Sequence, residues 1–163
     1  MKTLEVKINS VDEMISLGYI MGSISYPNLV IGLNGDLGAG KTVFTKGIGK
    51  YLGVKRVINS PTFTIMKIYD TNNETISNLY HLDVYRLDNA EADFELEEYF
   101  YLDGLTIIEW SKIIYDILPN DMWNIEINIL GENERLVKLV VEEEVLEELL
   151  KKLMEENYEV IYR

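Results

Sequence analysis

Eight consecutive residues carry the clearest chemical signal in the sequence. The segment from Gly35 to Thr42, GDLGAGKT, matches the phosphate-binding pattern G-x-x-x-x-G-K-[ST]. Its glycines allow the backbone to curl so that successive N–H groups point at one anion, and a helix that follows directs its N-terminal dipole at the phosphates. In such a loop, Lys41 places its charge on the β- and γ-phosphates and the Thr42 hydroxyl binds Mg²⁺. A chance match in a chain of this length has a probability of about 1 in 200, so these residues predict a nucleotide site.

The segments on either side fit this interpretation. Leu29 to Leu33 is a continuous apolar run, as expected of a strand buried on both faces of a parallel sheet. The pattern from Lys41 to Leu52 is helical, and Gly53 is suited to end that helix. The motif therefore lies between a buried strand and a helix, which is the context that it requires. The residues expected to contact the nucleotide here are Asp36, Leu37, Gly38, Ala39, Gly40, Lys41, Thr42 and Val43.

Two carboxylates could complete the site. Asp83 ends the apolar segment 79–83, and Glu109 ends the segment 105–109. Both acids would lie at the carboxyl end of a strand, where ligands bind in open α/β sheets. Either could hold Mg²⁺ or orient water, and the residues alone do not choose between them. Because the chain has no Asn-Lys-x-Asp motif for guanine, ATP is the expected nucleotide.

The remaining segments must position these residues. Residues 4–8 alternate like a strand, and Ser10 with Glu13 forms a capping box that opens a helix to about Ile24. Further along, we expect strands over 63–69, 76–85 and 105–108, helices over 88–103, 111–118 and 142–156, and a hairpin of 123–130 with 135–141. This alternation predicts the α/β class. We expect a single P-loop NTPase domain over residues 1–163, in which a central, mostly parallel sheet is flanked by helices and extended by antiparallel strands, with 142–163 packed on it.

Composition excludes several classes of function. Of the 163 residues, 15 are Lys or Arg and 28 are Asp or Glu, so the net charge is −13. Nucleic acids and anionic membranes both require clustered basic residues, so the chain alone is expected to bind neither. The absence of Cys excludes thiolate metal sites and Cys nucleophiles, and the single His81 excludes a His-rich metal site. No apolar run approaches a membrane span and no signal-peptide core begins the sequence, so we expect a cytoplasmic protein.

With these features in place, the sequence resembles the TsaE (YjeE) family, the small P-loop ATPases of bacterial tRNA threonylcarbamoyladenosine (t6A) biosynthesis. The resemblance covers roughly residues 5–140. It depends on several motifs in a fixed order, and the whole set is far more specific than the loop alone. These motifs are the loop 35–42, Ser60-Pro61-Thr62-Phe63-Thr64, His81-Leu82-Asp83-Val84-Tyr85-Arg86, Asp103-Gly104 and Ile108-Glu109-Trp110.

The resemblance implies roles for the residues of these motifs. Thr42 and Glu109 look like the Mg²⁺ ligands, and Asp83 looks like the acid that supports hydrolysis. Thr62 belongs to a switch-like loop and would sense the γ-phosphate. A P-loop ATPase needs a second acid and a mobile loop of this kind, so the implied roles agree with the chemistry.

Further residues are assigned by the resemblance alone. Trp110 is similar to an aromatic residue needed for activity and is expected among the nucleotide-binding residues, with a core residue as the alternative. Ser10 would lie near the nucleotide and Arg135 near its base. For His81, both a buried histidine with satisfied hydrogen bonds and a catalytic base remain open. The C-terminal helix could cap the edge of the sheet or contact a partner.

The resemblance also implies partners. These are the TsaD and TsaB proteins, which transfer threonylcarbamoyl to adenosine 37 of tRNAs that read ANN codons, and which the chain would reset by ATP hydrolysis. The chain itself is not expected to bind nucleic acid stably. Two alternatives remain, a P-loop small-molecule kinase and a nucleotide-binding module without hydrolysis. The kinase is disfavoured because no pair of the four arginines lies in a segment that resembles a lid.

Overall fold

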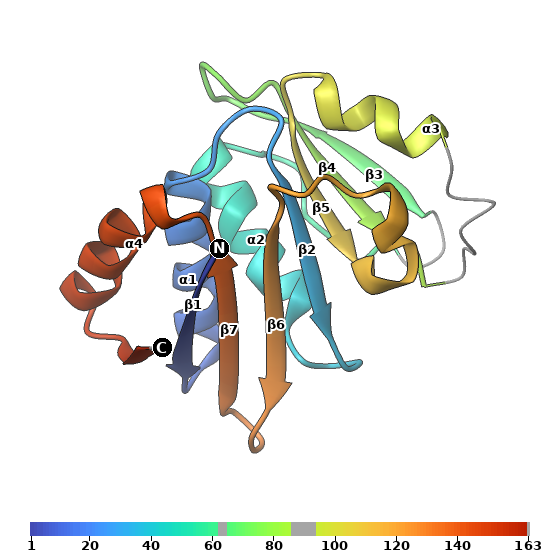
Figure 1. The fold of residues 1–163 in the computed structure, drawn as a ribbon. Coiled ribbons are helices and arrows are strands. Elements are labelled where there is room, and N and C mark those ends of the chain that lie inside the picture. Colours follow the sequence, from blue (N-terminus) through green and yellow to red (C-terminus); the bar gives the residue numbers. More distant parts are fainter. Residues whose placement is uncertain (62–64, 86–93, 163) are drawn as a thin grey trace.

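An eight-stranded sheet forms the centre of the computed structural model, which describes residues 1–61, 65–85 and 94–162 (Figure 1). The strand order is β3-β4-β5-β2-β6-β7-β1-β8. The four central strands β4, β5, β2 and β6 run parallel, whereas the outer pairs are antiparallel. This arrangement confirms the predicted P-loop fold class. The strands are β1 (Lys2–Ile8), β2 (Val30–Gly35), β3 (Met66–Asp70), β4 (Asn78–Asp83), β5 (Leu105–Glu109), β6 (Trp123–Ile129), β7 (Arg135–Val141) and β8 (Glu159–Tyr162).

Helices cover both faces of this sheet. The α-helices are α1 (Val11–Ser23), α2 (Lys41–Leu52), α3 (Phe94–Glu97) and α4 (Glu143–Glu155), and the 3-10 helices are η1 (Glu98–Tyr101) and η2 (Ser111–Ile117). One hydrophobic core lies under α1, α2 and α4, and a second lies under η1 and η2. In β2, Ile31 and Leu33 belong to the first core and Val30 to the second. Burial on both faces explains why this strand is a continuous apolar run.

A close approach of α1 to α2 fixes the helix that follows the phosphate-binding loop. The two helices lie side by side in Figure 1. They meet at Gly18 and Gly47, where an added Cβ would lie 2.1 Å from the Phe44 carbonyl oxygen and 2.0 Å from the Ile15 carbonyl oxygen, respectively. Because any side chain there would collide with backbone, both positions require glycine. The N-terminus of α2 is thereby held at the end of β2.

The start of α1 agrees with the predicted capping box, with one difference. The Ser10 hydroxyl accepts a hydrogen bond from the Glu13 N–H at 3.1 Å. The Glu13 carboxylate in turn accepts from the N–H of Asn9, at 2.6 Å, rather than from that of Ser10. The first bond satisfies a backbone N–H that the helix itself leaves unpaired, and the second pairs the N–H of the residue before the N-cap.

Two predicted helices differ in form from the expectation. The acidic helix expected over 88–103 falls partly on residues 86–93, which lie outside the described residues. Its described part is the single turn α3 followed by η1, in which Leu96 and Phe100 are buried in the second core. The helix expected over 111–118 is the 3-10 helix η2, which is kinked at Ile114. In both segments, packing of a few apolar side chains on the sheet overrides regular α-helix geometry.

The C-terminal segment adds a strand that was not among those predicted. The predicted helix 142–156 is confirmed as α4, and the residues after it return as β8, which pairs antiparallel with β1 at the sheet edge. At the start of α4, the Glu142 carboxylate accepts hydrogen bonds from the Tyr26 hydroxyl and from Trp123 Nε1. These bonds attach the helix to the sheet. None of the helices in the described ranges has the length and apolar character needed to cross a membrane.

A tyrosine between α4 and β8 fastens this segment to α1. The Tyr158 hydroxyl donates to the Glu13 carbonyl oxygen at 2.8 Å, and burial is the main reason why its pKa is raised from 10.0 to about 12. The fold favours the neutral hydroxyl, so its stabilising contribution is complete below pH 10 and is lost as the pH rises from 10 to 12. We expect Tyr158→Phe to lower the free energy of unfolding by about 1 kcal/mol below pH 10 and to remove this pH dependence.

Urea unfolding of the wild type and of Tyr158→Phe, at pH values on either side of this range, measures both effects. Tyr115→Phe is the matched control, because the Tyr115 side chain is 71% exposed. An equal loss of stability in the wild type and in Tyr158→Phe above pH 10 would contradict the prediction.

Candidate nucleotide site

The predicted phosphate-binding loop connects the end of β2 to the first residue of α2. Gly38 and Gly40 have φ angles of +80° and +114°, a conformation that glycine adopts without strain. The loop is closed by a hydrogen bond from the Ala39 N–H to the Asp36 carbonyl oxygen, at 3.0 Å. Leu37, at the tip, is 86% exposed. The strand, loop and helix expected from the motif are therefore all present.

Lys41 is buried at the centre of the site. Its Nζ donates to the Gly35 carbonyl oxygen at 2.7 Å, lies 3.9 Å from the centroid of the Trp110 ring, and is 4.0 Å from Glu109 Oε1. Burial lowers the pKa of Lys41, while the nearby carboxylates of Glu109, Asp83 and Asp36 act in the opposite direction. The ammonium thus faces both the loop and the acids, at a position from which it can bind a phosphate.

The two candidate acids lie side by side. Asp83 and Glu109 are register partners at the ends of the neighbouring parallel strands β4 and β5, and both side chains are buried. Asp83 Oδ1 accepts a hydrogen bond from the Tyr85 N–H at 3.0 Å. Glu109 faces Lys41 with one carboxylate oxygen and His81 with the other. The sequence did not decide which of the two acids completes the site. The structure places both on the wall of the same cavity.

His81 is a partner of Glu109 that the sequence did not reveal. Its Nε2 lies 2.6 Å from Glu109 Oε2, and the ring is completely buried. Among the described residues, its Nδ1 has no hydrogen-bond partner. The contact fixes the orientation of the Glu109 carboxylate. Alternation along β4 places His81 and Asp83 on the same face, which is the signal that could have indicated it.

A cavity of about 440 Å³ brings most of the predicted residues together. Lys41, Thr42, Asp83, Glu109 and Trp110 line it, as do Leu37, Gly38, Gly40, Val43 and Ser60. The Trp110 ring lies 4.8 Å from the Tyr85 ring, and its backbone has a φ of +63°. Asp36 does not line this cavity but a neighbouring one of about 220 Å³. Thr62 and Arg86 lie outside the described residues.

These residues fit a magnesium ion that is held jointly with a nucleotide. Mg²⁺ in such sites uses one or two carboxylates, while phosphate oxygens and water supply its other ligands. Glu109 and Thr42 offer one carboxylate and one hydroxyl on the wall of the same cavity. Among the described residues, no group of three or more His, Cys, Asp or Glu could hold a metal ion without a nucleotide.

A smaller cavity, of about 130 Å³, lies on the other side of the loop. Ser10 and Arg135 line it together with Gly38, Ala39, Gly40 and Val43, so both residues lie beside the loop. The Ser10 hydroxyl caps α1. The Arg135 guanidinium, expected near the base, donates to backbone carbonyl groups of the loop and of the β6–β7 turn.

Comparison with known proteins agrees with this geometry. The profile of the family described as threonylcarbamoyl adenosine biosynthesis protein TsaE matches residues 8–137. The chain belongs to the TsaE family. The Bacillus subtilis (strain 168) tRNA threonylcarbamoyladenosine biosynthesis protein TsaE is 41% identical over 135 residues, which are 83% of this chain and 84% of that protein. TsaE of Rickettsia bellii (strain RML369-C) is 39% identical over 137 residues, covering 83% and 93% of the two chains.

A solved structure extends the match to the fold. The crystal structure of Bacillus subtilis YdiB superposes with a TM-score of 0.77 and 33% identity, covering 96% of this chain and 97% of that one. The residues that match the TsaE family, 8–137, include all the residues that line the 440 Å³ cavity, and the superposition on YdiB covers 96% of the chain. Membership of the TsaE family therefore applies to the segment that carries the predicted site.

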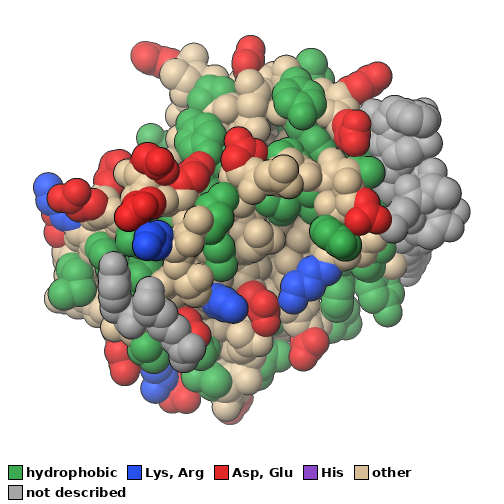
Figure 2. All heavy atoms as spheres, in the orientation of Figure 1, with side chains coloured by type: hydrophobic (Ala, Val, Ile, Leu, Met, Phe, Trp, Pro, Cys, Tyr) green, Lys and Arg blue, Asp and Glu red, His purple; other side chains and the backbone are tan. Residues whose placement is uncertain are grey.

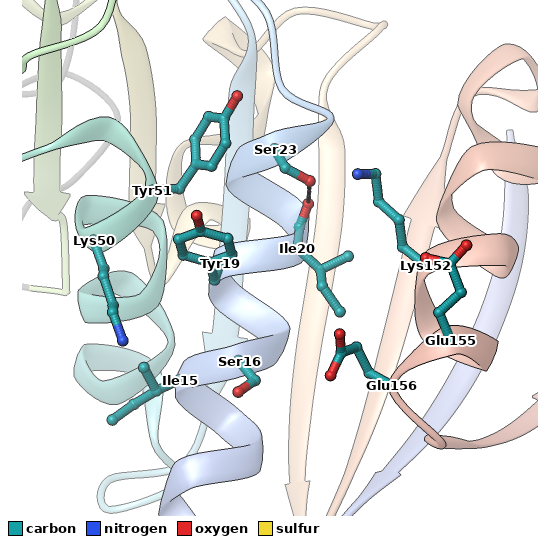
Figure 3. A pocket seen from close by; sticks show the side chains of 10 residues that line it. All are labelled: Ile15, Ser16, Tyr19, Ile20, Ser23, Lys50, Tyr51, Lys152, Glu155 and Glu156. Carbon is teal, nitrogen blue, oxygen red and sulfur yellow. Dashed lines mark hydrogen bonds between the residues drawn. The ribbon is translucent and has the colours of Figure 1, made fainter.

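A larger cavity in this TsaE-family chain lies elsewhere. It measures about 580 Å³ and lies between α1, α2 and the end of α4, where Lys50, Lys152, Glu155 and Glu156 line it (Figure 3). None of the residues predicted to bind a nucleotide lines it, and its walls are helix surfaces rather than a loop of backbone amides. The largest of these cavities is therefore not the one that the predicted nucleotide-binding residues line.

Proposed function

We propose that this TsaE-family chain binds and hydrolyses ATP in the cytoplasm, as a single-domain subunit required for t6A modification of tRNA position 37 that acts on the TsaD–TsaB complex. One observation carries the proposal. Lys41, Thr42, Asp83 and Glu109 come from three separate elements, and all four line the cavity beside the phosphate-binding loop. Phosphoryl transfer from a nucleotide requires this combination of a cation, a hydroxyl and carboxylates.

Binding of ATP would depend mainly on its phosphates. The backbone N–H groups of the loop and the N-terminus of α2 attract anions, and Lys41 adds a buried charge to the same cavity. ATP rather than GTP is proposed because the chain lacks the Asn-Lys-x-Asp guanine motif.

We assign the hydrolysis of ATP to the two acids, Asp83 and Glu109. His81 holds one oxygen of Glu109 while the other faces Lys41, so this carboxylate has a fixed orientation. We assign Glu109, with Thr42, to binding of Mg²⁺, and the adjacent Asp83 to supporting the attack of water. Mg²⁺ bound there would neutralise charge on the β- and γ-phosphates. A hydrolase of ATP needs one residue that binds the ion and another that orients water, and Glu109 and Asp83 on neighbouring strands can fill these two roles.

The surface supports a protein partner rather than direct binding of tRNA. The net charge is −13, and Figure 2 shows acidic side chains spread over the visible face with few basic ones among them. Such a surface repels a phosphate backbone. In contrast, the apolar side chain of Leu37 is exposed at the rim of the cavity, and the Tyr85 ring, which contacts Trp110, is 59% exposed. We therefore propose that the TsaD and TsaB proteins carry the tRNA.

Phosphate release from ATP, measured for the chain alone and with TsaD and TsaB of the same organism, tests this function. We expect slow hydrolysis by the chain alone and a sharp increase when the pair is added. No increase would contradict a partner-activated ATPase. Titration calorimetry with ADP and ATP then separates a nucleotide-binding module from a chain that binds no nucleotide.

A further inference from the structure

Arg135 occupies an unusual position for a residue expected near a nucleotide base. It is the first residue of β7, and its guanidinium donates hydrogen bonds to carbonyl groups on two separate segments. On the phosphate-binding loop, Nε donates to Ala39 at 2.8 Å and Nη2 donates to Gly38 at 3.2 Å. On the β6–β7 turn, Nη1 donates to Gly131, Glu134 and Glu132 at 2.8, 2.9 and 3.3 Å.

These bonds determine how the loop presents its amides. In a trans peptide, the carbonyl and the N–H of the same unit point in opposite directions. Because the Ala39 carbonyl is directed at Arg135, the N–H of Gly40 is directed away from it. Gly38 and Gly40 line both cavities, Arg135 lines only the smaller one, and Lys41 lines only the larger one. The Gly38 and Ala39 carbonyl groups therefore face Arg135, and the Gly40 N–H points to the opposite side of the loop, where Lys41 lines the proposed phosphate site.

We propose that Arg135 is a positioning residue, which holds the carbonyl groups of the phosphate-binding loop away from the nucleotide cavity and keeps the loop ready for an anion before a nucleotide arrives. It acts through the backbone of Gly38 and Ala39, not by contact with the nucleotide. A loop that is ordered beforehand loses less entropy when it binds a ligand. The inference deepens the proposed function, since the loop that it orders is the proposed ATP site.

The geometry requires arginine rather than positive charge alone. A guanidinium presents five N–H groups in a rigid planar fork, whereas the lysine ammonium is one nitrogen on a flexible stem. Only the fork reaches the loop carbonyls with Nε and Nη2 while Nη1 holds the turn. Arg135→Lys should consequently resemble Arg135→Ala, although it keeps the charge.

Two measurements on the full-length chain test the proposal. The first is residue-resolved NMR amide exchange without nucleotide, followed at the Ala39 N–H, whose bond to Asp36 closes the loop. The second is ADP affinity by calorimetry. In both Arg135→Ala and Arg135→Lys, we expect Ala39 exchange to accelerate by about tenfold and ADP affinity to fall by about tenfold to a hundredfold. Lys46→Ala, which removes an exposed charge from α2, should match the wild type in both.

Each other result would overturn the proposal in its own way. Wild-type exchange and affinity in Arg135→Lys would show that charge suffices. Weaker ADP binding with unchanged Ala39 exchange would indicate direct contact with the nucleotide. Faster exchange throughout β1, β2 and α1 would indicate a general folding role. If the wild type binds no ADP, the proposed function fails, while the exchange data from the nucleotide-free chain still decide whether Arg135 orders the loop.

Discussion

Replacing Lys41 by alanine is expected to lower the affinity for ADP and ATP by about tenfold to a hundredfold, because it removes a charge-assisted contact to the phosphates. In the structure, the ammonium lies between the Gly35 carbonyl, the Trp110 ring and Glu109. The residue is buried, so its charge acts with little screening by solvent. Calorimetric titration with ADP and ATP measures the loss.

Lys46→Ala is the matched control for Lys41→Ala, because Lys46 lies on the same helix and is exposed. It should bind both nucleotides like the wild type. A thermal melt of each variant shows whether the change at Lys41 disturbs the fold, since it also removes a partner of Glu109. Wild-type affinity in Lys41→Ala would contradict a phosphate site at this loop.

The phosphate-binding loop and most strands could be predicted because their signals are local. The loop is contiguous from Gly35 to Thr42, and β2 shows its burial directly as an apolar run. Asp83 and Glu109 could each be identified as an acid at a strand end. The parallel pairing of β4 with β5, which brings them together, is a tertiary contact that sequence patterns at this scale do not specify.

The parts that the sequence could not supply are contacts between distant residues. His81 and Glu109 are 28 positions apart, and Arg135 and Ala39 are 96 apart. The resemblance placed Arg135 near the nucleotide base, whereas its hydrogen bonds to the Gly38 and Ala39 carbonyl groups could be seen only in the structure. β8 was missed because it is only four residues long. Val160, Ile161 and Tyr162 are residue types that favour strands, but the β1 edge that they pair with is a distant contact. The proposed role of Thr62 remains a prediction, since that residue lies outside the described ranges.

Neutralising Glu109 and neutralising Asp83 are expected to have different effects on ATP affinity and hydrolysis. Glu109→Gln should abolish the Mg²⁺-dependent part of ATP affinity and reduce hydrolysis with TsaD and TsaB on the order of a hundredfold, because it removes the carboxylate assigned to the ion. Asp83→Asn should leave ATP affinity within about twofold and slow hydrolysis by at least about tenfold, because its role is assigned to the attack of water. Calorimetry with Mg²⁺ or with EDTA, together with phosphate release, measures both.

The comparison is informative because the two acids share an environment. Both are buried, both end neighbouring strands, and both favour the charged form of Lys41. A general loss of negative charge around Lys41 would therefore affect Glu109→Gln and Asp83→Asn alike. Only Glu109 is held by His81 with its second oxygen facing Lys41, and glutamine keeps the shape and an oxygen for that contact. Equal loss of Mg²⁺ dependence in both variants would show that the acids bind the ion as a pair, and the division of roles between them would be wrong.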